Sequence, residues 1–74
     1  MPRLRTVESA SIDAVGYDDA NEELYLRFRE SGDTYAYYGV EPEVYEELMQ
    51  AGSMGRFVNL KIKGHYFYRK LDED

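Results

Sequence analysis

An alternating run of apolar and polar residues in the middle of the chain constrains the fold more than any other sequence feature. Residues 24–29 read Leu-Tyr-Leu-Arg-Phe-Arg. Because neighbouring side chains of a strand point to opposite faces, this segment has one apolar face and one half-polar face. Residues 31–33, Ser-Gly-Asp, have the composition of a tight turn, and residues 34–40 are rich in tyrosine, as a returning strand would be. The pattern predicts a β-hairpin with one face packed on a core.

A further strand and two helices are predicted around this hairpin. Residues 11–17 alternate in part and precede a turn rich in Asp and Asn at residues 18–21, which indicates a strand. Pro42 suits the first position of a helix that ends near Gly52, and Ser53 suits the N-cap of a second helix that ends near Gly64. The apolar residues of each helix share one face, namely Val44, Tyr45, Leu48 and Met49, then Met54, Phe57, Val58 and Ile62.

The order of these elements predicts an α+β fold, because strands come first and helices follow. Short connections favour pairing between neighbouring strands. We therefore expect a three-stranded antiparallel meander followed by two helices packed on one sheet face. Residues 65–71 form either a short C-terminal strand or an extended tail over the core. The whole chain, residues 1–74, is expected to be a single domain with a core at about residues 7–71 and loose termini at residues 1–6 and 72–74.

The composition narrows the classes of function. A chain of 74 residues without cysteine has no disulfides, no thiol chemistry and no cysteine-based zinc site. His65 is the only histidine, and no spacing marks a catalytic or metal-binding partner for it. We therefore expect a protein that is not an enzyme and that binds neither a cofactor nor a metal ion. Because no segment has the ~20 apolar residues of a membrane span, and the first residues lack a signal-peptide core, we expect a cytoplasmic protein without a membrane segment.

An ordered set of short motifs runs through nearly the whole chain. They are Ser9-x-Ser11-Ile12, Val15-Gly16-Tyr17-Asp18, Leu24-x-Leu26-x-Phe28, Gly32-x-x-Tyr35-x-Tyr37, Val40-x-Pro42-x-Val44-Tyr45 and Ala51-x-Ser53-x-Gly55-x-Phe57-x-Asn59-x-x-Ile62-Lys63-x-x-Tyr66. This set resembles the KTSC domain, a module named for its occurrence at the C-terminus of some lysyl-tRNA synthetases and also found alone. Two positions depart from the family pattern. The family often has a second serine directly before the position of Ser11, where this chain has Ala10, and it often has Val directly before Pro, whereas here Glu41 separates Val40 from Pro42. The resemblance implies a domain of unknown role, for which the synthetase setting suggests RNA binding.

Positive charge is concentrated near the C-terminal end. The net charge is −8 over residues 1–50, +5 over residues 51–71 and −3 over residues 72–74. A basic segment on an acidic body favours a local anionic partner, while the net sign opposes long-range attraction to nucleic acid. We therefore predict a module that binds RNA or tRNA. Its phosphate contacts would come from four cations and its base stacking from two exposed tyrosines, namely Arg56, Lys63, Arg69 and Lys70, with Tyr25 and Tyr38.

Other interpretations remain open at this point. Tyr35 and Tyr37 share a face and are expected to pack beneath the helices rather than to stack on bases. A protein-interaction module, self-associating or with another protein, is the alternative function, although a monomer is favoured. Its basis is the acidic face of the first helix, which complements the basic face of the second, namely Glu43, Glu46 and Glu47 against Arg56, Asn59 and Lys63.

Overall fold

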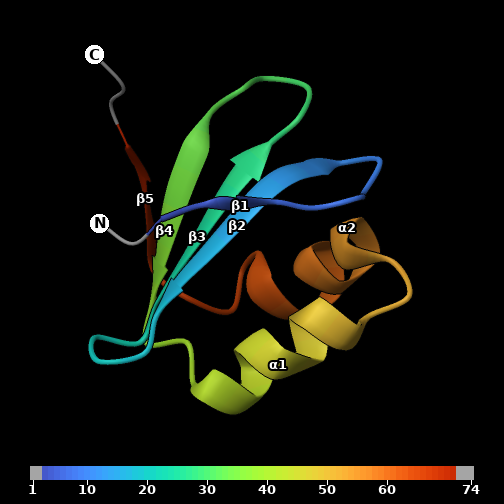
Figure 1. The fold of residues 1–74 in the computed structure, drawn as a ribbon. Coiled ribbons are helices and arrows are strands. Elements are labelled where there is room, and N and C mark those ends of the chain that lie inside the picture. Colours follow the sequence, from blue (N-terminus) through green and yellow to red (C-terminus); the bar gives the residue numbers. More distant parts are fainter. Residues whose placement is uncertain (1–2, 72–74) are drawn as a thin grey trace.

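The computed structural model describes residues 3–71 of the chain and shows a sheet with helices on one side (Figure 1). The sheet has five strands in the order β1-β2-β3-β4-β5, and every neighbouring pair is antiparallel. The elements are β1 (Arg5–Thr6), β2 (Ile12–Asp18), β3 (Glu23–Phe28), β4 (Thr34–Tyr38), α1 (Pro42–Gln50), α2 (Met54–Phe57), η1 (Val58–Ile62) and β5 (Tyr68–Leu71). The predicted α+β order, with a meander followed by helices, is therefore confirmed.

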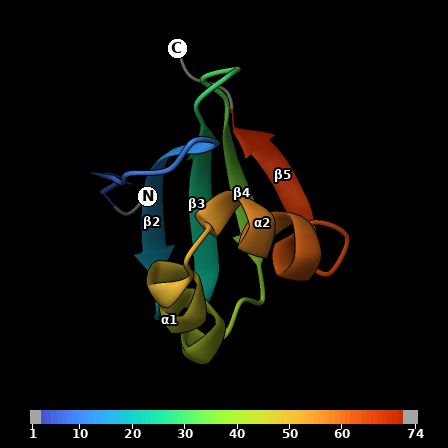
Figure 2. The same cartoon turned by 90° about the vertical axis from the view of Figure 1, so that its right-hand side faces the viewer.

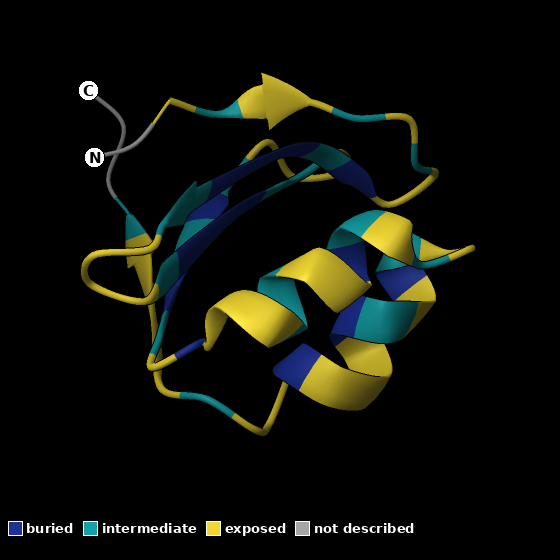
Figure 3. Ribbon diagram, turned by 60° about the horizontal axis from the view of Figure 1, so that its bottom comes forward, coloured by how far each residue is buried: buried dark blue, intermediate teal, exposed yellow. Residues whose placement is uncertain are grey.

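The strand register places the apolar face of β3 under the helices. Leu24 pairs with Tyr17 and Tyr37, and Leu26 pairs with Val15 and Tyr35. Paired residues share a sheet face, so these side chains form the floor of the core. Figure 3 shows buried residues on the central strands and on the helix sides that face them. The buried core residues are Ile12, Val15, Leu24, Leu26, Tyr37, Val40, Leu48, Val58 and Ile62.

A pair of tyrosines attaches α1 to the sheet. The rings of Tyr17 and Tyr45 stack with centroids 4.5 Å apart and planes 7° apart. The Tyr17 hydroxyl donates a 2.6 Å hydrogen bond to the carbonyl oxygen of Val40, just before the helix begins. Burial, followed by the charge of Glu22, raises the pKa of Tyr17. The hydroxyl therefore stays protonated and keeps the start of α1 against the sheet.

The second helix differs from the expected single α-helix. Ser53 caps it as predicted, since its hydroxyl oxygen accepts a 3.3 Å hydrogen bond from the Arg56 amide. After Phe57 the helix widens into the π-helical η1, where the Lys63 amide donates to the Val58 carbonyl oxygen at 2.8 Å. A π-helical turn contains one residue more than an α-helical turn. Val58 and Ile62 are both buried, while Leu60, between them, is 57% exposed, so the segment keeps one face on the core.

Both edges of the sheet extend beyond the predicted meander. Residues 5–6, expected to belong to a loose arm, form β1 and pair with Ala14 and Val15. Residues 68–71 form β5 and pair with β4, which settles the open choice in favour of a C-terminal strand. Figure 2 shows β5 beside β4, with the helices in front of the sheet. The predicted loose terminus at residues 72–74 lies outside the described residues.

Candidate functional site

A groove of about 1020 Å³ opens between the helical layer and one end of the sheet. Its walls come from the start of β2, the end of β3 with the following turn, β4, the α2–η1 segment and β5. α1 contributes no residue to these walls, so one end of the apolar sheet face stays accessible. The groove therefore combines a floor of strand side chains with a wall of helix side chains.

Aromatic rings form the sheet side of this groove. The rings of Phe28 and Tyr35 meet edge to face at 5.7 Å, and Tyr68 lies 5.8 Å from Tyr35 and 5.7 Å from Tyr37. Tyr68 is 61% exposed, whereas Tyr37 is only 3% exposed. Burial, with smaller effects of Tyr35 and Tyr68, raises the pKa of Tyr37 to about 12. The cluster thus combines a buried, neutral Tyr37 with a Tyr68 ring that is open to solvent.

One cation is available in the groove. Among the described residues that line it, Arg29 and Lys63 are the cations and Glu30 is the anion. The ammonium of Lys63 lies 4.9 Å from the centroid of the Phe28 ring. A cation–π contact of this kind at an exposed site is worth only about 0.5–1 kcal/mol. Lys63 can therefore leave the ring when an anionic group offers a stronger partner.

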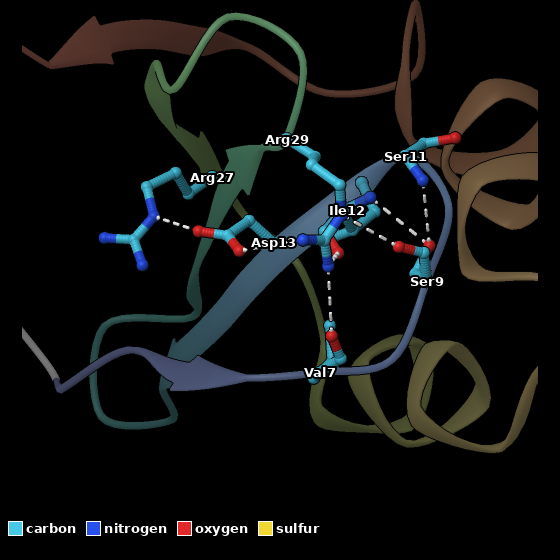
Figure 4. Close-up of polar contacts among 7 residues, drawn as sticks. All are labelled: Val7, Ser9, Ser11, Ile12, Asp13, Arg27 and Arg29. Carbon is cyan, nitrogen blue, oxygen red and sulfur yellow. Dashed lines mark hydrogen bonds and ion pairs between the residues drawn. The ribbon is translucent and has the colours of Figure 1, made fainter.

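Arg29, by contrast, is held in a polar cluster at the start of β2 (Figure 4). Its guanidinium donates to the carbonyl oxygens of Ser9 at 3.1 Å and Ile12 at 3.3 Å, and lies 3.4 Å from the Asp13 carboxylate. Asp13 also accepts a 2.8 Å hydrogen bond from Arg27. Because these contacts use several of its donors, Arg29 fixes the groove wall and is poorly placed to bind a phosphate.

The turn between β3 and β4 is also fixed by hydrogen bonds. The Phe28 amide donates to the Asp33 carbonyl oxygen at 2.9 Å, and the Gly32 amide donates to the Phe28 carbonyl oxygen at 2.8 Å. Gly32 has a φ of 74°, a left-handed conformation that glycine adopts without strain. The Ser31 hydroxyl oxygen accepts from the Asp33 amide at 3.2 Å. Glu30 thus projects from a well-defined turn at the groove edge.

A second, shallower hollow of about 710 Å³ lies on the opposite sheet face. Tyr25 pairs with Ala36, and Ala36 pairs with Arg69, so these residues share the face that the helices leave uncovered. The Tyr25 hydroxyl donates a 2.5 Å hydrogen bond to the Glu23 carboxylate. That hydrogen bond, followed by burial, raises the pKa of Tyr25 to about 12.

The structure divides the residues predicted to bind RNA between the two faces. Tyr25, Tyr38 and Arg69 lie on the face of the hollow, whereas Lys63 lines the groove and Arg56 is exposed on α2. Lys70 borders the hollow, but it pairs with Tyr35, so its side chain lies on the groove side of β5. They do not form one surface. The expectation that Tyr25 is exposed is wrong, because the side chain is 7% exposed and its hydroxyl is held by Glu23. Tyr38 is half-buried, and the ammonium of Lys70 lies 3.5 Å from the Asp33 carboxylate.

Three residues of the groove were missed as site residues in the sequence. Phe28 belongs to the predicted apolar face of its strand, and Tyr68 lies in the segment for which the sequence allows either a strand or an extended tail. Glu30 follows the predicted strand and carried no signal of its own. Tyr37 packs in the core as expected, and Tyr35 packs against the core while also lining the groove. The groove could not be inferred because its walls come from segments far apart in the sequence.

Across residues 3–71, no group of three or more His, Cys, Asp or Glu side chains is arranged to hold a metal ion. In the same part of the chain, no helix has the length and apolar character to cross a membrane.

Comparison with known proteins agrees with the motifs in the sequence. Residues 8–66 match the family described as the KTSC domain. The chain is a KTSC domain. A crystal structure of a KTSC domain protein from Yersinia pestis superposes with a TM-score of 0.92 at 39% identity, covering 97% of this chain and 100% of that one.

Relatives of this KTSC domain fall into two kinds. A protein of Tsukamurella paurometabola is 49% identical over 85% of this chain and 92% of its own length, and its name states no function. An uncharacterized protein of Stutzerimonas stutzeri is 39% identical over 89% of this chain and 93% of its own length. A lysine–tRNA ligase of Nostoc sp. is 38% identical over 86% of this chain but only 11% of its own length. The domain thus matches short stand-alone proteins and a small part of a large enzyme.

Proposed function

We propose that this KTSC domain is a non-enzymatic, cytoplasmic module that binds single-stranded RNA, and that the groove takes an unpaired base. The observation that carries the proposal is the aromatic groove, whose lining includes the exposed ring of Tyr68 and Lys63, a cation that forms no ion pair within residues 3–71. Proteins bind single strands by stacking bases on aromatic side chains and placing cations near the backbone. The matching segment of lysine–tRNA ligases supports the proposal, because those enzymes are named for a tRNA reaction.

The charge of the domain sets the expected affinity. A net charge of −6 repels a polyanion at long range, and Lys63 is the one cation of the groove outside an ion pair among the described residues. Each phosphate contact to a single strand contributes about −0.7 to the slope of log K against log salt. With one or two such contacts, the slope should be close to about −1. The domain therefore gains modest affinity from charge and depends on stacking.

The test is an amide NMR titration of labelled protein with a short single-stranded RNA and with tRNA, at low and physiological salt. Tyr68→Ala should weaken binding about tenfold or more, because stacking on one aromatic ring contributes about 1–3 kcal/mol per base. Lys63→Ala should weaken it less and flatten the salt dependence. Both side chains are exposed, so both variants are expected to fold.

Variants on the opposite face serve as matched controls. Tyr38→Ala and Arg69→Ala also remove a tyrosine and a cation, but they border the hollow rather than the groove. They should leave the affinity unchanged. Equal losses from both pairs of variants would refute the groove as the binding site. The absence of any RNA-dependent shift at either salt would refute RNA binding.

Protein interaction is the second candidate function, and exposed apolar residues near β5 favour it. Phe67 is 88% exposed and directly precedes this edge strand. Exposed apolar groups beside an open sheet edge are typical of interaction sites. The glutamates of α1 are exposed as the charge pattern requires, namely Glu43, Glu46 and Glu47. Sedimentation velocity over a range of protein and salt concentrations tests self-association, and a monomer under every condition would rule it out.

A further inference from the structure

Glu30 is a negative charge placed at the edge of a groove that is otherwise aromatic and cationic. It lines the groove and is exposed, and it takes part in no ion pair within residues 3–71. A carboxylate opposes the binding of a phosphate, so an RNA-binding groove gains nothing from it by charge. It can contribute only by accepting hydrogen bonds, since an ionised carboxylate has acceptors and no donors.

We infer that the groove selects a guanine base, with Glu30 accepting hydrogen bonds from its Watson–Crick edge. This inference rests on the proposed function. Guanine presents two adjacent donors on that edge, the N1–H and the N2 amino group, which match the two oxygens of one carboxylate. Adenine and cytosine present an amino group beside an acceptor nitrogen, and uracil presents one N–H between two carbonyl oxygens. For these three bases an acceptor faces the carboxylate, and such a contact is repulsive.

The two charges of the groove fix the orientation of the nucleotide. Lys63 lies at the C-terminal end of η1, and Glu30 lies on the β3–β4 turn. The phosphate is attracted to Lys63 and repelled by Glu30, so the base edge faces the turn. The exposed ring of Tyr68 then stacks on the flat side of the base, and Tyr35, inclined at 50° to it, contacts the base edge. Lys63 exchanges its contact with Phe28 for the phosphate.

The other polar groups near the groove discriminate less well between the four bases. Asn59, Ser11 and Ser31 also line it, but hydroxyl and amide groups donate as well as accept and can adapt to any base. The carboxylate cannot adapt in this way. The backbone of the turn that carries Glu30 is fixed by hydrogen bonds of its neighbours, so less backbone entropy is lost when the side chain binds. A well-formed bidentate contact discriminates between bases by about tenfold or more.

The test compares nine-nucleotide RNAs of uridine that carry one central guanosine, inosine, adenosine, cytidine or uridine. Binding is measured by fluorescence anisotropy with the full chain. The guanosine strand should bind about tenfold more tightly than the adenosine, cytidine and uridine strands. Inosine keeps the N1–H but lacks the N2 amino group, and should fall between them.

The decisive variant is Glu30→Gln, read as the ratio of affinities between the guanosine and adenosine strands. Removal of a negative charge raises the affinity for the adenosine, cytidine and uridine strands, whereas the guanosine strand also loses its hydrogen bonds to the carboxylate, so the ratio should fall to near one. Glu43→Gln, an exposed glutamate of α1, is the charge-matched control and should leave the ratio unchanged. Amide spectra of both variants confirm that they fold.

The outcomes separate the two proposals. Binding in the groove without preference for guanosine, or a preference that survives Glu30→Gln, overturns the base selectivity and leaves RNA binding standing. Failure of all five strands to bind overturns RNA binding and the selectivity together. A guanosine preference that is lost in Glu30→Gln but kept in Glu43→Gln supports both RNA binding and the base selectivity.

Discussion

The contact between Gly55 and Ser11 offers a quantitative test of how α2 meets the sheet. Gly55 is a buried residue of α2, and a Cβ at this position would lie 2.6 Å from Ser11 Oγ and 3.0 Å from Ser11 Cβ. By helix propensity alone, Gly55→Ala would stabilise the domain by about 1 kcal/mol. Overpacking costs about 1–3 kcal/mol. The first Ser11 atom can rotate away, but the second cannot, because it is fixed to the backbone.

Because Ser11 Cβ cannot move aside, the overpacking cost should lie in the upper part of this range, at about 2–3 kcal/mol. After the gain in helix propensity of about 1 kcal/mol, we expect Gly55→Ala to lower the free energy of unfolding by about 1–2 kcal/mol. For a domain of this size, 1 kcal/mol corresponds to about 4–8 °C in Tm. Thermal and urea denaturation followed by circular dichroism would measure the change. Gly52→Ala is the control, because a Cβ there meets no atom within 4 Å and the backbone φ is not positive. Its effect should stay within about 1 kcal/mol and be stabilising.

A double-mutant cycle separates the steric cost from the helix propensity. In the Ser11→Gly background both clashing atoms are gone, so Gly55→Ala should now stabilise by up to about 1 kcal/mol. The coupling energy between the two sites would then be about 2–3 kcal/mol, well above the error of additivity. If Gly55→Ala is as stable as the parent protein, or loses the same stability in both backgrounds, the close approach of α2 to β2 is not what requires glycine.

Three further changes test other contacts. The pKa values of Tyr25 and Tyr37 are about 12 against an ordinary 10.0, so the unfolded chain releases these protons first as the pH rises. The free energy of unfolding should therefore fall between about pH 10 and 12, by up to about 1.4 kcal/mol per pH unit for each group. Urea titrations should show a smaller dependence of this free energy on pH for Tyr25→Phe. Tyr17→Phe removes the hydrogen bond to Val40 and should cost about 1 kcal/mol in urea denaturation, whereas an unchanged midpoint would show that water replaces it. Asp13→Asn breaks a partly exposed ion cluster and should cost no more than about 1 kcal/mol, a loss that 1 M salt should reduce.

The central part of the fold could be predicted from local sequence signals. The alternation at residues 24–29 defines the covered face of β3, and Pro42 and Ser53 mark where the two helices begin. These signals work because they report on hydrogen bonding and burial within a few residues. They say nothing about contacts between distant segments, which is why β1 was not expected.

Tyr25 shows how such a distant contact changes a site prediction. The alternation correctly places it on the face away from the helices, but that face is not open there. Its cross-strand partner is Gly16, and Leu4 Cδ2 lies only 2.7 Å from where a Cβ on that glycine would be. The N-terminal segment thus approaches the sheet beside Tyr25. The groove escaped prediction for the same reason, since Phe28, Glu30 and Tyr68 come together only when the sheet and helices are assembled.

The π-turn in η1 has a consequence for how this domain can change in length. A π-turn is an α-helical turn that carries one additional residue, and here Leu60 is the exposed apolar residue within it. Deleting Leu60 would turn the hydrogen bond between the Lys63 amide and the Val58 carbonyl oxygen into an ordinary α-helical bond. Val58 and Ile62 would then be three positions apart and still face the core. The segment could thus lose a codon in evolution, or have gained one, without disturbing the packing beneath it.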